Sequence, residues 1–287
     1  MHERLLGCVG MYRIVAMQTL APQTKLIEIY APEIAAKAHA GQFVILRVDE
    51  EGERIPLTLA DWKPKANTIT LIFQEVGVST IKLGSLNVNE ELCDVVGPLG
   101  NPTDIRNYGT VVIVGGGVGI APCLPIAKAF KKAGSRVISI IGARNEKLLI
   151  LEREMRCICD EVHISTDDGS KGHKGFVSDV LNILIKKGYS IDIVYAIGPS
   201  VMMRAIAETT RPHKIKTVVS LNPIMVDGMG MCGVCRVSVG GKVKFACVDG
   251  PEFDAHQVDF DQLIKRQRAF LAEERTALEH WEKCRGN

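Results

Sequence analysis

Four residues suited to binding iron lie in one glycine-rich segment. Asp227, Cys232, Cys235 and Cys247 follow the spacing D-x4-C-x2-C-x11-C. This spacing is close to that of plant-type [2Fe–2S] proteins, with an aspartate in place of the first cysteine. A zinc site and a coincidence of core cysteines remain alternatives, although zinc favours paired Cys and His ligands and no histidine is near. The spacing favours the cluster, with all four residues as its ligands.

Two glycine turns suit a dinucleotide. The sequence GGGVGIAP (115–122) follows an apolar run and opens a helical pattern, where free amides and the helix dipole bind phosphate. Ile120 occupies the place of the third glycine of the usual fingerprint. A second turn, Gly198-Pro199, separates another apolar run from another helix start. Such turns at the ends of parallel strands border a nucleotide-binding crevice.

A cation and a hydroxyl-rich turn precede these glycines. Arg54 begins the motif RIPLT (54–58), and Gly77, Ser79 and Thr80 belong to GVST (77–80). An arginine beside a turn rich in N–H and O–H donors suits a flavin diphosphate. Taken alone, Arg54 also fits a solvated strand position, and Ser79 and Thr80 also fit a helix cap.

The pattern of elements predicts how these residues are positioned. Short β-type runs at 25–30, 42–48, 68–76 and 91–96 predict an antiparallel β-barrel, or a β-sandwich, over residues 11–108. Alternating strands and helices predict a parallel α/β domain over 109–220, with helices near 147–156, 176–187 and 200–210. Residues 221–255 form a small cysteine module. Residues 256–287 predict one amphipathic helix, and residues 1–10 are interpreted as a leader or extension.

The ordered motifs resemble the ferredoxin-NADP reductase superfamily. They are RxPLT, GVST, GPLGN (97–101), GGGVGIAP, GAR (142–144), DDGS (167–170), IGPxxMM and the cysteine module, and together they cover about residues 12–255. Within the superfamily the sequence is most similar to the small subunits of NADH-dependent ferredoxin:NADP oxidoreductase, also described as sulfide dehydrogenase. It is also similar to the electron-transfer subunits of dihydroorotate dehydrogenase. Asp227 favours the former group, because the latter carries a cysteine there.

The resemblance implies a role for each matched residue. It places Thr58 near the reactive flavin N5, as the residue closest to the chemistry. It implies FAD contacts from Arg54, Pro56, Leu57, Gly77, Ser79 and Thr80, with Leu57 where many members have an aromatic residue. It implies NAD(H) contacts from Gly116, Gly117, Gly119, Gly198 and Pro199. Asp168, with Asp167, is a candidate for the ribose hydroxyls, and Arg144 is the competing cation.

These features predict an oxidoreductase subunit that carries electrons between NAD(H), FAD, a [2Fe–2S] cluster and a larger partner subunit, and indirectly ferredoxin. The alternatives are a dihydroorotate dehydrogenase subunit and a non-enzymatic, zinc-stabilised nucleotide-binding protein. A free-standing ferredoxin reductase is disfavoured, because such proteins lack the cysteine module. The formal charge of +2 argues against a nucleic-acid partner. Glycines and prolines interrupt the apolar stretch 111–127, so we expect no membrane span and a cytoplasmic protein.

Overall fold

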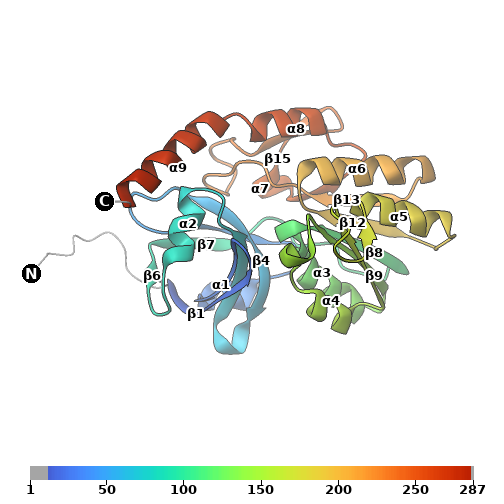
Figure 1. Cartoon of the computed structure of the whole chain (residues 1–287), viewed down its shortest axis with the longest axis horizontal. Helices are drawn as coiled ribbons and strands as arrows, with labels where there is room; N and C mark the ends of the chain where they lie inside the picture. The colour runs from blue at the N-terminus through green and yellow to red at the C-terminus, as the bar shows by residue number, and fades with distance from the viewer. Residues whose placement is uncertain (1–11, 286–287) are drawn as a thin grey trace, which may run out of the picture.

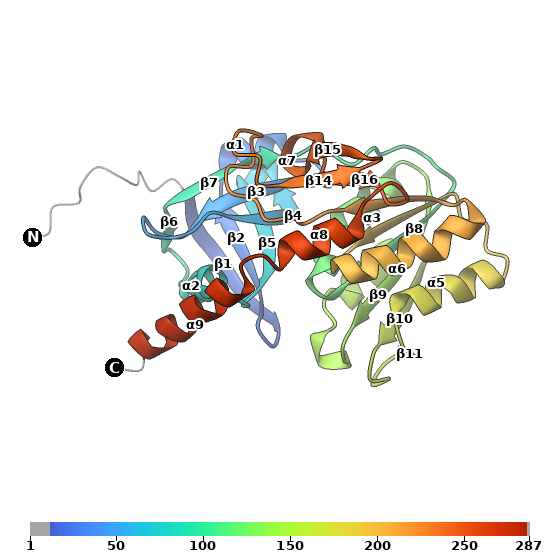
Figure 2. The ribbon, with the colours of Figure 1, turned by 90° about the horizontal axis from the view of Figure 1, so that it is seen from above.

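The computed structural model describes residues 12–285, so the interpretation of residues 1–10 lies outside the described residues. A strand-rich half and an α/β half lie side by side, and the C-terminal helices cross above both (Figure 1). The second view, from above, shows the same two halves with the C-terminal helices running from one to the other (Figure 2).

The first half is an antiparallel sheet with the strand order β6-β1-β2-β5-β4-β3-β7. Alternating apolar residues fill its interior with buried side chains such as Ile27, Leu46 and Leu71. The sheet is nearly closed, as predicted for a β-barrel. Its elements are β1 (Tyr12–Ala21), β2 (Thr24–Tyr30), α1 (Pro32–Lys37), β3 (Phe43–Arg47), β4 (Ile55–Lys63), η1 (Pro64–Ala66), β5 (Thr68–Gln74), α2 (Val78–Ser85), β6 (Glu91–Leu92) and β7 (Asp94–Leu99).

The second half is a mostly parallel sheet with the strand order β11-β10-β9-β8-β12-β13-β16. Helices α3 and α4 cover one face, and α5 and α6 cover the other, as predicted for an α/β domain. The elements are β8 (Thr110–Gly116), η2 (Gly117–Gly119), α3 (Ile120–Lys132), β9 (Arg136–Ala143), η3 (Glu146–Leu148), α4 (Glu152–Ile158), β10 (Glu161–Thr166), β11 (His173–Lys174), α5 (Val177–Lys186), β12 (Ile193–Ile197), α6 (Ser200–Thr210), η4 (Arg211–His213) and β13 (Lys216–Ser220).

The cysteine module is held between these halves. It comprises the loop after β13, the hairpin β14 (Arg236–Val239) and β15 (Lys242–Phe245), and the short helix α7 (Ala246–Asp249). Strand β16 (Glu252–Asp254) then joins the α/β sheet antiparallel to β13. Cys235 and Cys247 share one core with Phe43 and Ile45 of β3. The barrel therefore packs directly against the module.

The C-terminal segment forms two helices where one was predicted. Helix α8 (Phe260–Gln267) buries Phe260 and Leu263 next to α6 and β14, and α9 (Leu271–Arg285) follows after a break. Helix α9 lies against α2, with the Lys82 ammonium 5.1 Å from the ring centroid of Trp281. The prediction of a single helix was wrong, because α8 and α9 pack on different parts of the molecule. Among residues 12–285, no helix is long and apolar enough to cross a membrane.

Candidate functional site

Arg54 lies directly before β4, on the barrel. Its guanidinium makes an ion pair of 2.8 Å with Asp94 at the start of β7, and the two side chains are 33% and 28% exposed. The pair fixes the direction of the guanidinium and leaves further N–H groups for a phosphate. No motif pointed to Asp94, because a partner forty residues away is set by strand pairing.

The rest of the RIPLT motif lies on β4, paired with β3. Pro56, Leu57 and Thr58 are half-buried, and Thr58 is opposite Phe43 in the register of the two strands. Phe43 belongs to the core that contains the cysteine pair. The predicted flavin contacts on β4 are thus one strand away from the cysteine module.

The GVST turn begins α2 and lies beside the Arg54 segment. The Thr80 hydroxyl oxygen accepts the amides of Val76 and Gly77, at 3.0 and 3.1 Å. The Ser79 hydroxyl donates to the carboxylate of Glu53 at 3.3 Å, which links the turn to the residue before Arg54. A Cβ on Gly77 would meet no atom within 4 Å. This open space at a helix N-terminus suits a phosphate. Glu53 is a contact that the sequence did not reveal.

The glycines of the two nucleotide turns differ in their roles. The ends of β8 and β12 lie side by side, with Gly115 opposite Ile197. A Cβ on Gly119 would lie 2.4 Å from the Ile197 carbonyl oxygen, so Gly119 allows the two turns to pack. A Cβ on Gly117, which has φ +57°, would meet no atom within 4 Å, so this position faces open space. Gly117 is therefore the glycine at which a ligand has room to approach the backbone.

Met202 completes the contact between these turns. Pro199 precedes α6 and accepts the Met202 amide at 2.9 Å. A Cβ on Gly116 would lie 2.4 Å from the Met202 sulfur, and one on Gly198 would lie 2.8 Å from its Cε. The thioether therefore occupies the space that both glycines leave. Met202 belongs to the IGPxxMM motif, but its contact with the two glycines could not be inferred from the sequence alone.

Arg144 and Asp168 lie together at the ends of β9 and β10. The Asp168 amide donates to the Arg144 carbonyl oxygen at 3.2 Å. The Asp168 carboxylate accepts the hydroxyl and the amide of Ser170 at 2.6 and 2.9 Å, and these bonds, the hydroxyl first, lower the pKa of Asp168. Both side chains are exposed. The structure thus places an ionised carboxylate and a cation at adjacent strand ends.

Three of the predicted cluster ligands lie in the loop after β13, and the fourth, Cys247, lies on α7 beyond the hairpin. The sulfurs of Cys235 and Cys247 are 3.2 Å apart, and both residues are buried. Cys232 is exposed, and its amide donates to the Asp227 carboxylate at 2.7 Å. The same carboxylate accepts the amides of Met229 and Met231, at 2.9 and 3.1 Å. Asp227 therefore folds the loop around its own side chain.

This loop has the donor chemistry that an iron–sulfur cluster needs. Burial raises the pKa of the Cys247 thiol to about 12, while the Gly230 amide acts in the opposite direction by bonding to its sulfur. Amides that point at sulfur stabilise bound thiolates and tune cluster potentials. Within residues 12–285, no three His, Cys, Asp or Glu side chains are arranged to hold a metal ion. Binding of a cluster by the four predicted ligands would therefore require their side chains to come closer together than they are here.

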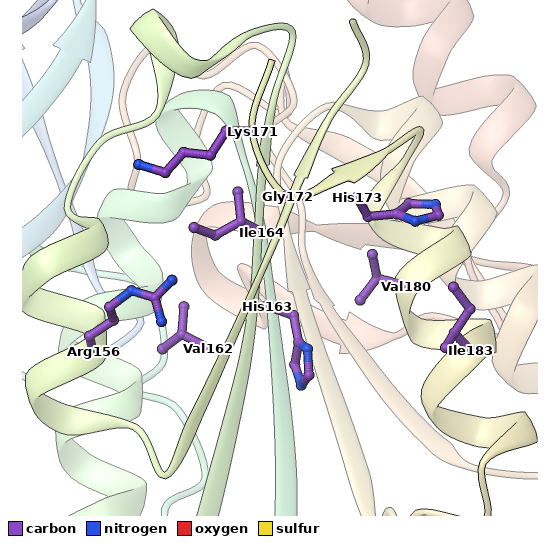
Figure 3. Close-up of a pocket in the computed structure, with 9 residues that line it drawn as sticks. All are labelled: Arg156, Val162, His163, Ile164, Lys171, Gly172, His173, Val180 and Ile183. Atoms are coloured by element: carbon purple, nitrogen blue, oxygen red, sulfur yellow. The ribbon is translucent and has the colours of Figure 1, made fainter. Parts of the chain in front are cut away.

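A cavity of about 450 Å³ lies elsewhere, at the β10 edge of the α/β sheet. Figure 3 shows Arg156, Val162 and Lys171 on one side of this edge, and Val180 and Ile183 on the other. Arg156 pairs with Glu152, and Lys171 pairs with Glu146 and Glu152. None of the predicted site residues lines this cavity, so it is not the predicted nucleotide crevice.

Two family models match the chain. Residues 113–208 match the oxidoreductase NAD-binding domain, and residues 222–259 match the iron–sulfur cluster binding domain of dihydroorotate dehydrogenase B. A curated relative from Thermotoga maritima, a dihydroorotate dehydrogenase B (NAD(+)) electron transfer subunit homolog, is 44% identical over 98% of this chain and 99% of its own. The electron transfer subunit from Clostridium perfringens is 31% identical over 79% of this chain and 90% of its own. The chain belongs to this family of electron-transfer subunits.

A solved structure adds a further relative. This structure is 43% identical to the chain, with a TM-score of 0.90, and the match covers 96% of this chain and 99% of its own. It is described as giving insights into flavin-based electron bifurcation via the NADH-dependent reduced ferredoxin-NADP oxidoreductase. Phthalate dioxygenase reductase, at 17% identity and a TM-score of 0.58, shares the fold. The matches confirm the predicted family, the fold and an NAD(P)H-dependent oxidoreductase subunit. They also support the predicted cofactors, FAD, a [2Fe–2S] cluster and NAD(H).

Proposed function

We propose that this electron-transfer subunit passes electrons between NAD(H), FAD, a [2Fe–2S] cluster and a larger partner subunit. The observation that carries the proposal is the position of β4. Helix α3, which begins after the glycine turn, packs on β4 from one side. On the other side, β4 pairs with β3, whose Phe43 and Ile45 share a core with Cys235 and Cys247. Strand β4 thus lies between the nucleotide turn and the cysteine pair.

Nicotinamide supplies a hydride, flavin takes two electrons and releases them singly, and an iron–sulfur cluster carries one. The task of the protein is therefore positioning, and no side chain needs to act as a general acid or base. We assign residues 11–108 to FAD binding, 109–220 to NAD(H) binding and 221–255 to the cluster. The C-terminal segment 256–287 is assigned to contacts between these parts and with the partner.

The assigned contacts follow the geometry of each turn. The Arg54 guanidinium and the donors of the α2 turn hold the FAD diphosphate, while Pro56, Leu57 and Thr58 lie along the isoalloxazine, with Thr58 nearest N5. Gly117 admits the nicotinamide nucleotide, and Gly116, Gly119, Gly198 and Pro199 shape the crevice that receives it. Asp168 binds the adenosine ribose beside Arg144. Asp227, Cys232, Cys235 and Cys247 hold the cluster.

Two relatives define the candidate partners. The dihydroorotate dehydrogenase B electron transfer subunit homolog is similar to this chain over 98% of its length. The solved structure of the ferredoxin-NADP oxidoreductase type has a similar identity, 43%, over 96% of this chain. We favour the second type, with ferredoxin as an indirect partner, because Asp227 stands where the dihydroorotate type carries a cysteine. Co-purification with a dihydroorotate-oxidising subunit would favour the first type instead.

Cofactor analysis of the anaerobically purified protein tests the function. We expect a brown-yellow protein with about one FAD and two irons per chain. Arg54→Ala should lose FAD and keep iron, because a hydrogen bond to a charged group contributes about 1.5 to 3 kcal/mol. Arg156→Ala, which removes a surface ion pair on α4, is the matched control and should keep both cofactors. Stoichiometric zinc without visible absorbance would contradict the proposal.

A further inference from the structure

A row of hydrogen bonds joins the barrel to the cysteine module. The Gln42 side-chain amide donates to the Gly100 carbonyl oxygen at 2.8 Å. The neighbouring Asn101 donates twice to the module, from its backbone amide to the Gly250 carbonyl oxygen at 2.7 Å and from Nδ2 to the Val248 carbonyl oxygen at 3.0 Å. We call Gln42, Gly100, Asn101, Val248 and Gly250 the barrel–module seam.

Both ends of the seam reach the proposed redox sites. On the barrel side, the Gln42 carbonyl oxygen accepts the amide of Leu59, the residue after Thr58, at 3.0 Å. On the module side, Val248 directly follows Cys247, whose sulfur is 3.2 Å from that of Cys235. The seam is therefore a continuous connection from the flavin strand β4 to the segment that carries a cluster ligand.

The seam leaves little space for alternative packing. A Cβ on Gly100, which has φ +75°, would lie 2.8 Å from the Phe43 ring and 2.9 Å from Pro251. Gln42 is buried, and its side-chain oxygen accepts the His39 amide at 3.0 Å, so both ends of this amide are bonded. Asn101 is exposed. Its side chain is thus the part of the seam that can be changed without opening a cavity in the core.

We propose that Asn101 is a positioning residue that holds the Cys247 segment at a fixed place against the flavin barrel. The inference rests on the proposed function and deepens it. The Asn101 amide restrains the Val248 carbonyl group and therefore the direction of the Cys247 sulfur. Hydrogen bonds and solvent exposure around the ligands set the potential of a cluster. Loss of the restraint should alter the cluster and leave the nucleotide and flavin sites unchanged.

The test compares Asn101→Ala and Asn101→Asp with the control Asn87→Ala, in the holoprotein. Aspartate has nearly the volume of asparagine but offers no donor to the Val248 carbonyl oxygen. Asn87 bonds within its own surface turn, to Glu90 at 3.3 Å. We expect both Asn101 variants to keep their FAD and the rate at which NADH bleaches it. The following reduction of the cluster should slow about fivefold, since one net hydrogen bond shifts an equilibrium by about that factor.

Two further readouts separate positioning from general stability. The cluster EPR signal should shift or broaden in both Asn101 variants and stay unchanged in Asn87→Ala. Hydrogen exchange of the residue 101 amide, measured in the protein without cofactors as well, should rise about fivefold. The inference is overturned if the EPR signal and cluster reduction match those of the wild type. A wild-type protein without FAD or iron would refute the proposed function, and the exchange result would still decide whether Asn101 holds the seam.

Discussion

At Asp227, three backbone amides and a proposed iron compete for the same two carboxylate oxygens. Met229, Met231 and Cys232 donate to it at 2.7 to 3.1 Å, and these bonds, Met229 first, hold the pKa of Asp227 below its ordinary value. One carboxylate offers about four lone-pair positions, so an amide and a metal can share it. The side chain therefore has two separable roles, shaping the loop and binding iron.

Three substitutions at Asp227 separate these roles. Asp227→Asn keeps an oxygen that accepts the loop amides but loses the charged ligand. We expect it, like Asp227→Ala, to retain at least about tenfold less iron than the wild type. Asp227→Cys should retain a [2Fe–2S] cluster with altered EPR g-values and a shifted potential. Iron content and EPR spectroscopy check both expectations. If the asparagine variant keeps the wild-type spectrum and iron content, Asp227 shapes the loop and is not a ligand.

The single-residue assignments come from motifs that themselves carry the chemistry, and the roles of these residues stay predictions. It predicted the approach to the backbone at the glycine turn, but it could not distinguish Gly119, which accommodates the Ile197 carbonyl group, from Gly117, which faces open space. Asp94 and Asn101 were not given a role, because their partners are 40 and 147 residues away. Contacts of this kind depend on tertiary packing, which local patterns do not report.

At the scale of elements, the strand ends of β9 and β10 present Arg144 and Asp168 side by side. An ionised Asp168 disfavours the additional phosphate of NADPH. Like charges repel, so NADH should reduce the flavin several-fold faster than NADPH at equal subsaturating concentration. Asp168→Asn should remove most of this preference, and the distant surface variant Glu208→Gln should not. Single-turnover flavin reduction measures it, and faster reduction by NADPH in the wild type would contradict the assignment.

Deletion of helix α8 and deletion of helix α9 should have different effects on the protein. Helix α8 buries Leu263 and binds Asn222 through Gln267, so its removal would damage the core. Helix α9 is mostly exposed and lies beside α2. A chain ending at Phe270 should keep FAD and iron and no longer co-purify with the partner subunit. A coloured truncated protein that still binds its partner would show that α9 packs only on its own chain.

The predicted elements agree with the structure where periodicity is regular. The pattern predicted a helix over 176–187, and α5 spans Val177–Lys186; the helix predicted over 200–210 is α6. The break between α8 and α9 was missed, because charged and apolar residues continue at helical spacing across it. Strand β16 was missed as well, since three residues have no period of their own and pair with β13 only after the module has folded back.

At the scale of the whole molecule, Glu252 joins three parts of the chain. It lies on β16, accepts the Thr103 hydroxyl at 2.6 Å, and is near Asp104 and Tyr195. A Cβ on Gly41 of the barrel would lie 3.0 Å from its carboxylate. Burial raises the pKa of Glu252 to about 7, with a smaller contribution in the same direction from Asp104. The junction of the barrel, the segment between β7 and β8, and strand β16 thus contains a carboxyl group that is protonated in mildly acidic solution.

This group should make the stability of the whole protein depend on pH. Its pKa is higher in the folded chain, so the unfolded chain binds fewer protons between about pH 4.5 and 7, and the contribution of Glu252 to stability falls as pH rises through this range. Glu252→Gln should remove that fall and gain about 3 kcal/mol relative to wild type at pH 8. Urea unfolding at pH 5 and pH 8 measures the difference. An unchanged difference between the two pH values would contradict the raised pKa.

The long sequence separation across the barrel–module seam has a consequence for the order of folding. Asn101 and Val248 are 147 residues apart, and the neighbouring Thr103–Glu252 bond spans 149. Domains usually fold as units and from the N-terminus during synthesis, and distant contacts close last. The barrel can therefore form while the ribosome is still making the α/β half, whereas the cysteine loop docks only when nearly the whole chain has emerged. We therefore expect cluster assembly to come late in maturation, after the barrel has formed.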